Sequence, residues 1–262
     1  MWLEVNGQRV YAATGNRPLD AAKASVVFVH GTGQDHSIWV LPTRYFARHD
    51  RNVLAVDLPG HGRSGGAPLE TVEAIADWLI AVLGAAGLAQ AAVVGHSLGS
   101  LVALAAAARH PDRVRSIAMV AVALPMRVAD GLLEAARNNR HEAIEMLNVW
   151  GFSSSAQLGG NPAPGLWMQG GGLRLLERAR PGVIHIDLRA CNDYAAGLEH
   201  AAAVACPALL ILGERDRVTP ARAARTLADT LPHAETAFLM GCGHALLAEA
   251  PDPVLDQLTK VV

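Results

Sequence analysis

One serine lies in a glycine-flanked motif that is typical of a nucleophile on a tight turn. Residues 95–99 read Gly-His-Ser-Leu-Gly, with Ser97 at the centre. The β-branched segment before the motif predicts a strand, and the alanine-rich segment after it predicts a helix. A serine on such a turn has a strained backbone, so the positions two before and two after it must lack side chains. The turn would expose the hydroxyl and place the N–H of Leu98 at a helix N-terminus, where a developing oxyanion is stabilised.

Such a motif alone also fits an ordinary glycine-rich turn, but four further motifs accompany it, each at the end of a predicted strand. They are His-Gly-Thr-Gly at residues 30–33, Asp-Leu-Pro-Gly-His-Gly-Arg-Ser at 57–64, Gly-Glu-Arg-Asp at 213–216 and Gly-Cys-Gly-His at 241–244. In this order the motifs resemble those of the α/β-hydrolase superfamily. The resemblance runs from near the first strand to the last helix of the chain.

The resemblance implies a catalytic triad in the chain order Ser97, Asp216, His244. A serine is weakly nucleophilic until a base takes its proton, which His244 would do before passing it to the leaving group. Asp216 would fix the imidazole tautomer and stabilise the imidazolium. The backbone N–H groups of Thr32 and Leu98 would form the oxyanion hole.

Other titratable residues near these motifs are rivals for the same roles. In the family, residues in the places of His30 and His61 usually serve structural hydrogen bonds, and the side chain of His96 should point away from the nucleophile. Glu214 shares the acid loop, but the G-x-x-D spacing favours Asp216.

Two further carboxylates are alternatives for the acid. Some relatives place the acid after the preceding strand, but that strand runs into residues 121–125 without a carboxylate, and Asp130 lies further on. Asp57 is expected to tie down its own turn. The serine at residue 97 also argues against epoxide hydrolases and haloalkane dehalogenases, which have aspartate at this position.

The elements that position these residues alternate between strands and helices. Asn6-Gly7 predicts a hairpin turn between strands at 3–5 and 8–13. Further strands are predicted at 25–30, 52–56, 91–94, 116–122, 208–212 and 235–240, and helices at 71–86, 98–109, 220–231 (with Thr219 as its N-cap) and 246–262, the last broken near Pro251 and Pro253. This alternation predicts the α/β-hydrolase fold, with a mostly parallel sheet and helices on both faces.

Residues 126–190 interrupt the alternation, because no strand is evident there. Residues 130–147 and 173–179 are predicted helices, separated by a loop at 151–172 that is rich in Gly, Ser and Pro. A segment of this length is usually functional. We expect a core of residues 1–125 and 191–262 and a small helical cap of residues 126–190 over the ligand-binding edge of the sheet.

Large apolar residues in and near the cap predict an apolar substrate pocket. The candidates for substrate contact are Trp39, Leu124, Met126, Trp150 and Trp167. For each one, packing of the cap onto the core is the simpler alternative.

These features predict a serine hydrolase that cleaves a small or medium, largely apolar carboxylic ester, lactone or thioester through an acyl-enzyme. One alternative keeps the triad but cleaves C–C bonds, or acts as a cofactor-free haloperoxidase. A remote alternative is a non-catalytic ligand receptor, which would be expected to have a damaged triad. The sequence shows no such damage.

Composition limits the partners. The 262 residues include 22 basic and 24 acidic side chains, giving a net charge of −2, and 51% are apolar. No basic cluster suggests nucleic acid or an anionic membrane, and neither a signal peptide nor a membrane span is evident. We expect a cytoplasmic enzyme with a small-molecule substrate.

The acyl-enzyme mechanism needs no cofactor, and none is expected. The spacing of Cys191, Cys206 and Cys242 matches no metal or redox motif, so three reduced thiols are predicted. No dinucleotide fingerprint is present.

Overall fold

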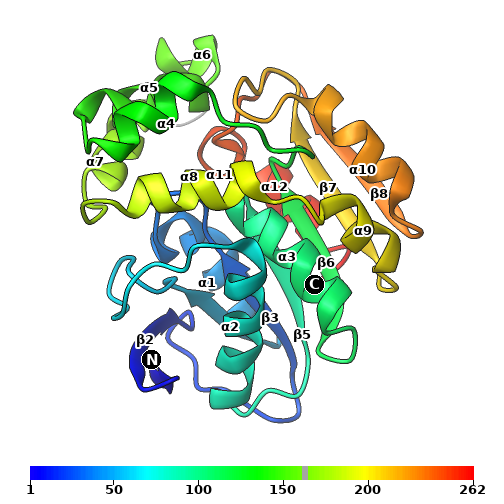
Figure 1. Cartoon of the computed structure of the whole chain (residues 1–262). Helices are drawn as coiled ribbons and strands as arrows, with labels where there is room; N and C mark the ends of the chain where they lie inside the picture. The colour runs from blue at the N-terminus through cyan, green and yellow to red at the C-terminus, as the bar shows by residue number, and fades with distance from the viewer. Residues whose placement is uncertain (161–164) are drawn as a thin grey trace.

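An eight-stranded sheet forms the centre of the protein, whose computed structural model describes residues 1–160 and 165–262 (Figure 1). The strands lie in the order β1-β2-β4-β3-β5-β6-β7-β8. They are β1 (Trp2–Val5), β2 (Gln8–Ala13), β3 (Ala24–Val29), β4 (Arg51–Val56), β5 (Ala91–His96), β6 (Val114–Val120), β7 (Ala208–Gly213) and β8 (Ala234–Leu239). Each predicted strand corresponds to one of these.

The first two strands pair antiparallel, as the hairpin prediction requires, and β2 pairs antiparallel with β4. Asn6 and Gly7 both have positive φ at the hairpin turn. All pairs from β4 through β8 are parallel. The mostly parallel α/β-hydrolase fold is therefore confirmed.

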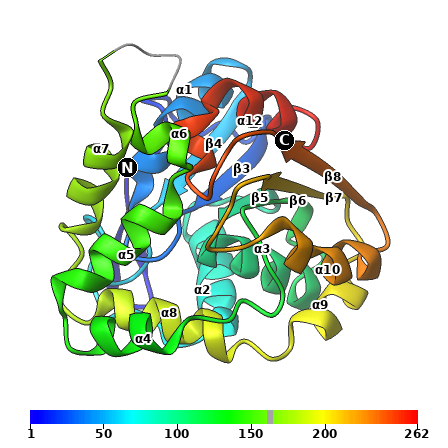
Figure 2. The same cartoon turned by 90° about the horizontal axis from the view of Figure 1, so that it is seen from above.

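Helices cover both faces of the sheet because side chains alternate along each buried strand. On one face, Val27 and Val29 join a core built with α2 (Val72–Ala85), α3 (Leu98–Arg109), α9 (Gly197–Ala203) and α10 (Arg225–Thr230). On the other, Val26 and Phe28 pack in a core with α1 (Val40–Arg48), α11 (Leu246–Glu249) and α12 (Pro251–Leu258). Figure 2 shows α1 and α12 on the opposite side of the sheet from α2 and α3.

Helices α4 (Asp130–Arg137), α5 (His141–Gly151), α6 (Ser154–Gln157) and α7 (Met168–Leu176), which follow β6, gather at one end of the molecule, at the upper left in Figure 1. Helix α8 (Val183–Asp193) lies between this group and the core and contacts both α4 and α3. As predicted, the described part of residues 126–190 contains no strand.

Several helices differ from the sequence predictions. The helix predicted at 130–147 is divided into α4 and α5, because Asn139 adopts a left-handed conformation with a φ of 50° just after α4. Part of the loop predicted at 151–172 forms α6 and the start of α7, and residues 161–164 lie outside the described residues. The last helix is broken at Ala250, where a break was expected.

Helices α1, α8 and α9 have no counterpart among the predictions. Helix α8 begins with Val183 and Ile184, β-branched residues that weaken the local helical signal. Within the described ranges, no helix combines the length and apolar character needed to cross a membrane.

The turn from β5 into α3 has no space for side chains at two positions. A Cβ atom on Gly95 would lie 1.8 Å from the carbonyl oxygen of Gly99, and one on Gly99 would lie 2.3 Å from that of Val29. These contacts are with backbone atoms, which cannot move aside as a flexible side chain can. The two glycines therefore set how closely α3 approaches β3 and β5.

We predict that Gly95→Ala lowers the free energy of unfolding by about 3 kcal/mol or more, because the methyl group must displace the backbone of α3. Gly84→Ala is the matched control. Gly84 lies in α2, and no neighbouring atom lies within 4 Å of the place that a methyl group would take, so alanine should stabilise by about 0.5–1 kcal/mol. Urea unfolding measures both, and equal stabilities of the two variants would contradict the prediction.

Candidate active site

Ser97 occupies the turn between β5 and α3 and has a strained backbone conformation. Its φ of 54° and ψ of −117° lie in a region that non-glycine residues rarely adopt. Its N–H donates to the carbonyl of Val120 at 2.9 Å, which ties the turn to β6. The residue is 7% exposed and lines a cavity. Backbone strain held in this way is typical of functional positions.

His244 and Asp216 are joined by a buried hydrogen bond. Nδ1 of His244 lies 2.8 Å from Oδ2 of Asp216. The other carboxylate oxygen accepts the N–H groups of Val218 and Thr219 at 2.8 and 2.7 Å. Because Nδ1 faces a carboxylate, it carries the proton, and the lone pair of Nε2 is left free.

Thr219 is a site residue that sequence reasoning assigned to another role. It was expected to cap the helix at 220–231, but that segment begins with a 3₁₀ turn, η2 (Ala221–Ala224), followed by α10. The Thr219 hydroxyl instead donates to Oδ2 of Asp216 at 2.7 Å and lies 3.0 Å from Nδ1 of His244. The order Asp-x-x-Thr in the loop was the available signal.

The rival acid, Glu214, points elsewhere. Its carboxylate accepts the N–H of Gly241 at 2.8 Å, which joins the loops after β7 and β8 at their exposed side. The geometry therefore favours Asp216 as the partner of His244.

His244 and Ser97 line the same cavity, together with Thr32. Within the described residues, no hydrogen bond joins the Ser97 hydroxyl to His244. Such bonds are often long without substrate and tighten when it binds. Leu98 is the first residue of α3, and the N–H groups of a first helical turn have no partner within the helix.

His30 and His96 hold neighbouring backbone groups. Nε2 of His30 accepts the N–H of Leu58 at 3.1 Å, and burial together with the adjacent His61 lowers the pKa of His30 to about 4. Nε2 of His96 donates to the carbonyl oxygen of His244 at 3.0 Å, and burial, followed by the nearby His244, lowers the pKa of His96 to about 3. Both rings are therefore neutral hydrogen-bonding groups at physiological pH.

The cavity has a volume of about 220 Å³ and is largely apolar. Of the residues predicted to contact substrate, Met126 and Trp150 line it. Trp39 is instead fully buried in the core, where it stacks on Phe28 at 5.0 Å between ring centroids.

Leu124 and Trp167 also lie apart from the lining. Leu124 packs against the backbone of Gly197 in α9, and Trp167 is 65% exposed beside Gly170. The alternation of strands and helices gave no means to separate such packing residues from lining residues. Several other lining residues, from α4, α5 and α8, were not predicted: Leu132, Asn148, Leu188 and Cys191.

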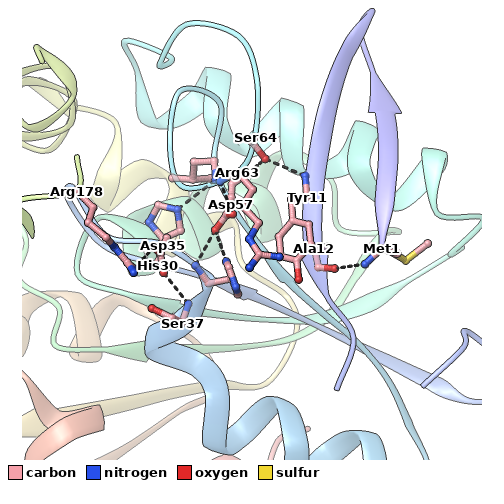
Figure 3. Close-up of polar contacts among 12 residues, drawn as sticks. Met1, Tyr11, Ala12, His30, Asp35, Ser37, Asp57, Arg63, Ser64 and Arg178 are labelled. Atoms are coloured by element: carbon pink, nitrogen blue, oxygen red, sulfur yellow. Dashed lines mark hydrogen bonds and ion pairs between the residues drawn. The ribbon is translucent and has the colours of Figure 1, made fainter. Parts of the chain in front are cut away.

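Asp35, His36 and Asp57 offer ligand atoms within 4.8 Å of one another, which is compatible with a metal ion. Figure 3 shows that Asp35 and Asp57 already have partners. Asp57 accepts the N–H and Nδ1 of His36 at 2.7 and 2.8 Å and the N–H of Arg63 at 2.9 Å. Asp35 accepts from Ser37 and from Arg178. We therefore assign the cluster to loop anchoring, as expected for Asp57.

The pKa of Asp216 is lowered in the folded protein, which makes the stability of the fold depend on pH. Burial alone would raise this pKa, but the His244 ring and the hydrogen bonds from Thr219 outweigh burial and lower it. A lowered pKa means that the carboxylate stabilises the fold above its unfolded pKa of about 4, and that this stabilisation is lost as the pH falls through the lower folded value.

We predict that the stability difference between wild type and Asp216→Asn shrinks as the pH falls below about 4, because the folded wild type must then take up a proton at Asp216. Urea unfolding at a series of pH values measures it. A difference that stays constant down to the acid-unfolding limit would contradict this linkage.

Comparison with known proteins identifies the family. A family model described as "Alpha/beta hydrolase family" matches residues 26–257. The pimeloyl-[acyl-carrier protein] methyl ester esterase of Chromobacterium violaceum is 33% identical over 230 residues, covering 80% of this chain and 82% of that protein. The protein of the same name from Proteus mirabilis is 27% identical over 264 residues, covering 92% and 94%.

Among solved structures, the enol-lactonase from Burkholderia xenovorans LB400 has the same fold. Its TM-score is 0.86 at 22% identity, with 99% of this chain and 98% of that chain covered. The family model spans β3 to α12, the whole region that carries the site. The chain therefore belongs to the α/β hydrolase family.

Proposed function

We propose that this protein is a serine hydrolase that cleaves a small or medium, largely apolar carboxylic ester, lactone or thioester. The observation that carries the proposal is the buried Asp216–His244 hydrogen bond at a cavity that the strained Ser97 also lines. The similarity to two methyl ester esterases supports ester cleavage.

In the proposed reaction, Ser97 attacks the carbonyl carbon while Nε2 of His244 takes the hydroxyl proton. The developing oxyanion is held by the N–H groups of Leu98 and Thr32. Collapse of the tetrahedral intermediate expels the alcohol, which receives the proton from His244. Water, activated by the same nitrogen, then releases the acid from Ser97.

The segment of residues 126–190 is proposed as a cap over this site. Residues from α4, α5 and α8 line the same cavity as Ser97 and His244. Leu132 and Leu188 supply apolar surface, and Met126 and Trp150 are the proposed substrate contacts. A wall of this composition favours an apolar acyl or alkoxy group.

We predict that a fluorophosphonate forms one covalent adduct with the wild type and none with Ser97→Ala, because only a serine activated by a base reacts with it. Ser97→Ala should also lower kcat for p-nitrophenyl butyrate by about 10⁴-fold or more. Intact-mass spectrometry measures the adduct. Ser154→Ala, at an exposed serine of α6, is the matched control and should react as wild type does.

Lack of an adduct on folded wild type would overturn the proposal in favour of a ligand receptor. Where the adduct forms, a panel of esters, thioesters and vinylogous diketones, with and without peroxide, identifies the bond cleaved. Turnover of the diketones alone would favour a C–C hydrolase, and halogenation with peroxide would favour a haloperoxidase.

We predict that Trp150→Ala shifts the preferred acyl chain of p-nitrophenyl esters toward longer chains, because it removes a wall of the cavity. The measurement is kcat/KM for acetate, butyrate, octanoate and decanoate esters. Trp167→Ala removes a tryptophan from the same segment but outside the cavity, and should leave the chain-length preference unchanged. The opposite pattern would assign substrate contact to Trp167.

A further inference from the structure

One face of α8 packs against the loop that carries the proposed oxyanion donor Thr32. Four buried residues of α8 lie on this face at helical spacing. They are Ile184, Asp187, Leu188 and Cys191. The same helix joins helices α4–α7 to the core (Figure 1).

Asp187 is a buried carboxylate with two partners from the core. Its Oδ2 accepts the N–H of Gly33 at 2.8 Å and faces Nε2 of His61 at 2.9 Å. The side chain of Asp187 is 1% exposed and that of His61 is 2% exposed. A charge buried so deeply is expensive unless it is fully paired, so this contact is specific.

The partners of His61 make it the positive member of the pair. Nε2 faces Asp187, and Nδ1 faces the carbonyl oxygen of Pro59 at 2.9 Å, so both ring nitrogens donate. Burial lowers the pKa of His61, but the charge of Asp187 and these hydrogen bonds, with a contribution from Asp57, raise it above its ordinary value. His30 also lies against the ring, at 4.9 Å between centroids, and it is neutral.

The contact acts on the peptide unit that follows Thr32. Gly33 has a φ of 65°, in the left-handed region that favours glycine, and its N–H belongs to the peptide that joins it to Thr32, so the bond to Asp187 holds the orientation of that peptide. A Cβ atom on Gly33 would lie 2.8 Å from Ile184, which shows that α8 rests on this peptide. Cys191 of α8 and Thr32 line the same cavity. Asp187 and Ile184 therefore both bear on Gly33, the residue that follows Thr32.

We propose that Asp187 is a positioning residue for the oxyanion hole: by holding the Gly33 N–H, it fixes the peptide geometry of Thr32 and couples α8 to the reacting centre. The inference rests on the proposed function. An oxyanion donor acts only within a narrow range of distance and direction, so a loop freed from Asp187 loses stabilisation of the transition state more than binding of the substrate.

The test compares Asp187→Ala, Asp187→Asn and Asp187→Glu with wild type. Asparagine keeps a carbonyl oxygen for Gly33 at the same reach, whereas glutamate keeps the charge but adds a methylene group that moves the oxygen. The expected result for alanine is a kcat about 10- to 100-fold lower with little change in KM. Asparagine should retain most of kcat, and glutamate should fall below asparagine.

Affinity for a boronic acid, which forms a tetrahedral adduct with an activated serine, should fall in parallel with kcat. If Asp187 only supported the fold, its substitution would lower the melting temperature without a parallel fall in kcat and boronate affinity. Asp193→Ala, at the exposed end of α8, is the matched control and should keep wild-type kcat.

A folded alanine variant with wild-type kcat and boronate affinity would overturn the inference. If the alanine variant does not fold, equal kcat values for asparagine and glutamate would overturn it. The wild-type fluorophosphonate adduct separates the two proposals. Absence of the adduct rejects the serine mechanism. An adduct on wild type, together with Asp187 variants that keep wild-type kcat and boronate affinity, rejects only the positioning role.

Discussion

The close approach of β5 and α3 is the constraint on which the site depends. With glycine at positions 95 and 99, the strand and the helix meet almost backbone to backbone, and Ser97 between them is forced to a positive φ. Strain of this kind costs about 1–3 kcal/mol. The nearly complete burial of β5 and α3, which are among the most apolar elements of the chain, offsets this cost. Stability gained across the whole sheet thus holds one residue in an unfavourable conformation.

Parallel pairing carries this constraint to the other site residues. Because β3, β5, β7 and β8 all run in the same direction, the loops after them meet at one edge of the sheet. The loops after β7 and β8 also meet closely, since a Cβ atom on Gly213 would lie 2.3 Å from the carbonyl oxygen of Gly243. His96 then links the serine turn to the carbonyl of His244. Thus each loop is fixed by its neighbours as well as by its own strand.

Sequence patterns predicted the features that depend on local chemistry. The strands, the turn glycines and the order of the motifs could all be read from residues that are close in the chain. The structure brings Ser97 and His244 to one cavity and joins His244 to Asp216. Contacts between distant residues were not accessible in this way. Trp39 was a candidate for substrate contact but stacks in the core, and Thr219 was predicted to cap a helix but bonds to Asp216. Their roles depend on the packing of elements, which composition alone does not specify.

Helix α8 illustrates why such contacts matter for function. The sequence did not predict this helix, because its local helical signal is weak. Its buried face nevertheless contacts two parts of the site: Leu188 lines the cavity, and Asp187 bonds to the Thr32–Gly33 peptide. A group that fills the cavity therefore presses on the same helix that orients the proposed oxyanion donor. Interiors packed at this density transmit displacement rather than absorb it. On this view the helices after β6 contribute to catalysis as well as to substrate binding, because the geometry of the Thr32 donor in the loop after β3 depends on the Asp187 carboxylate of α8.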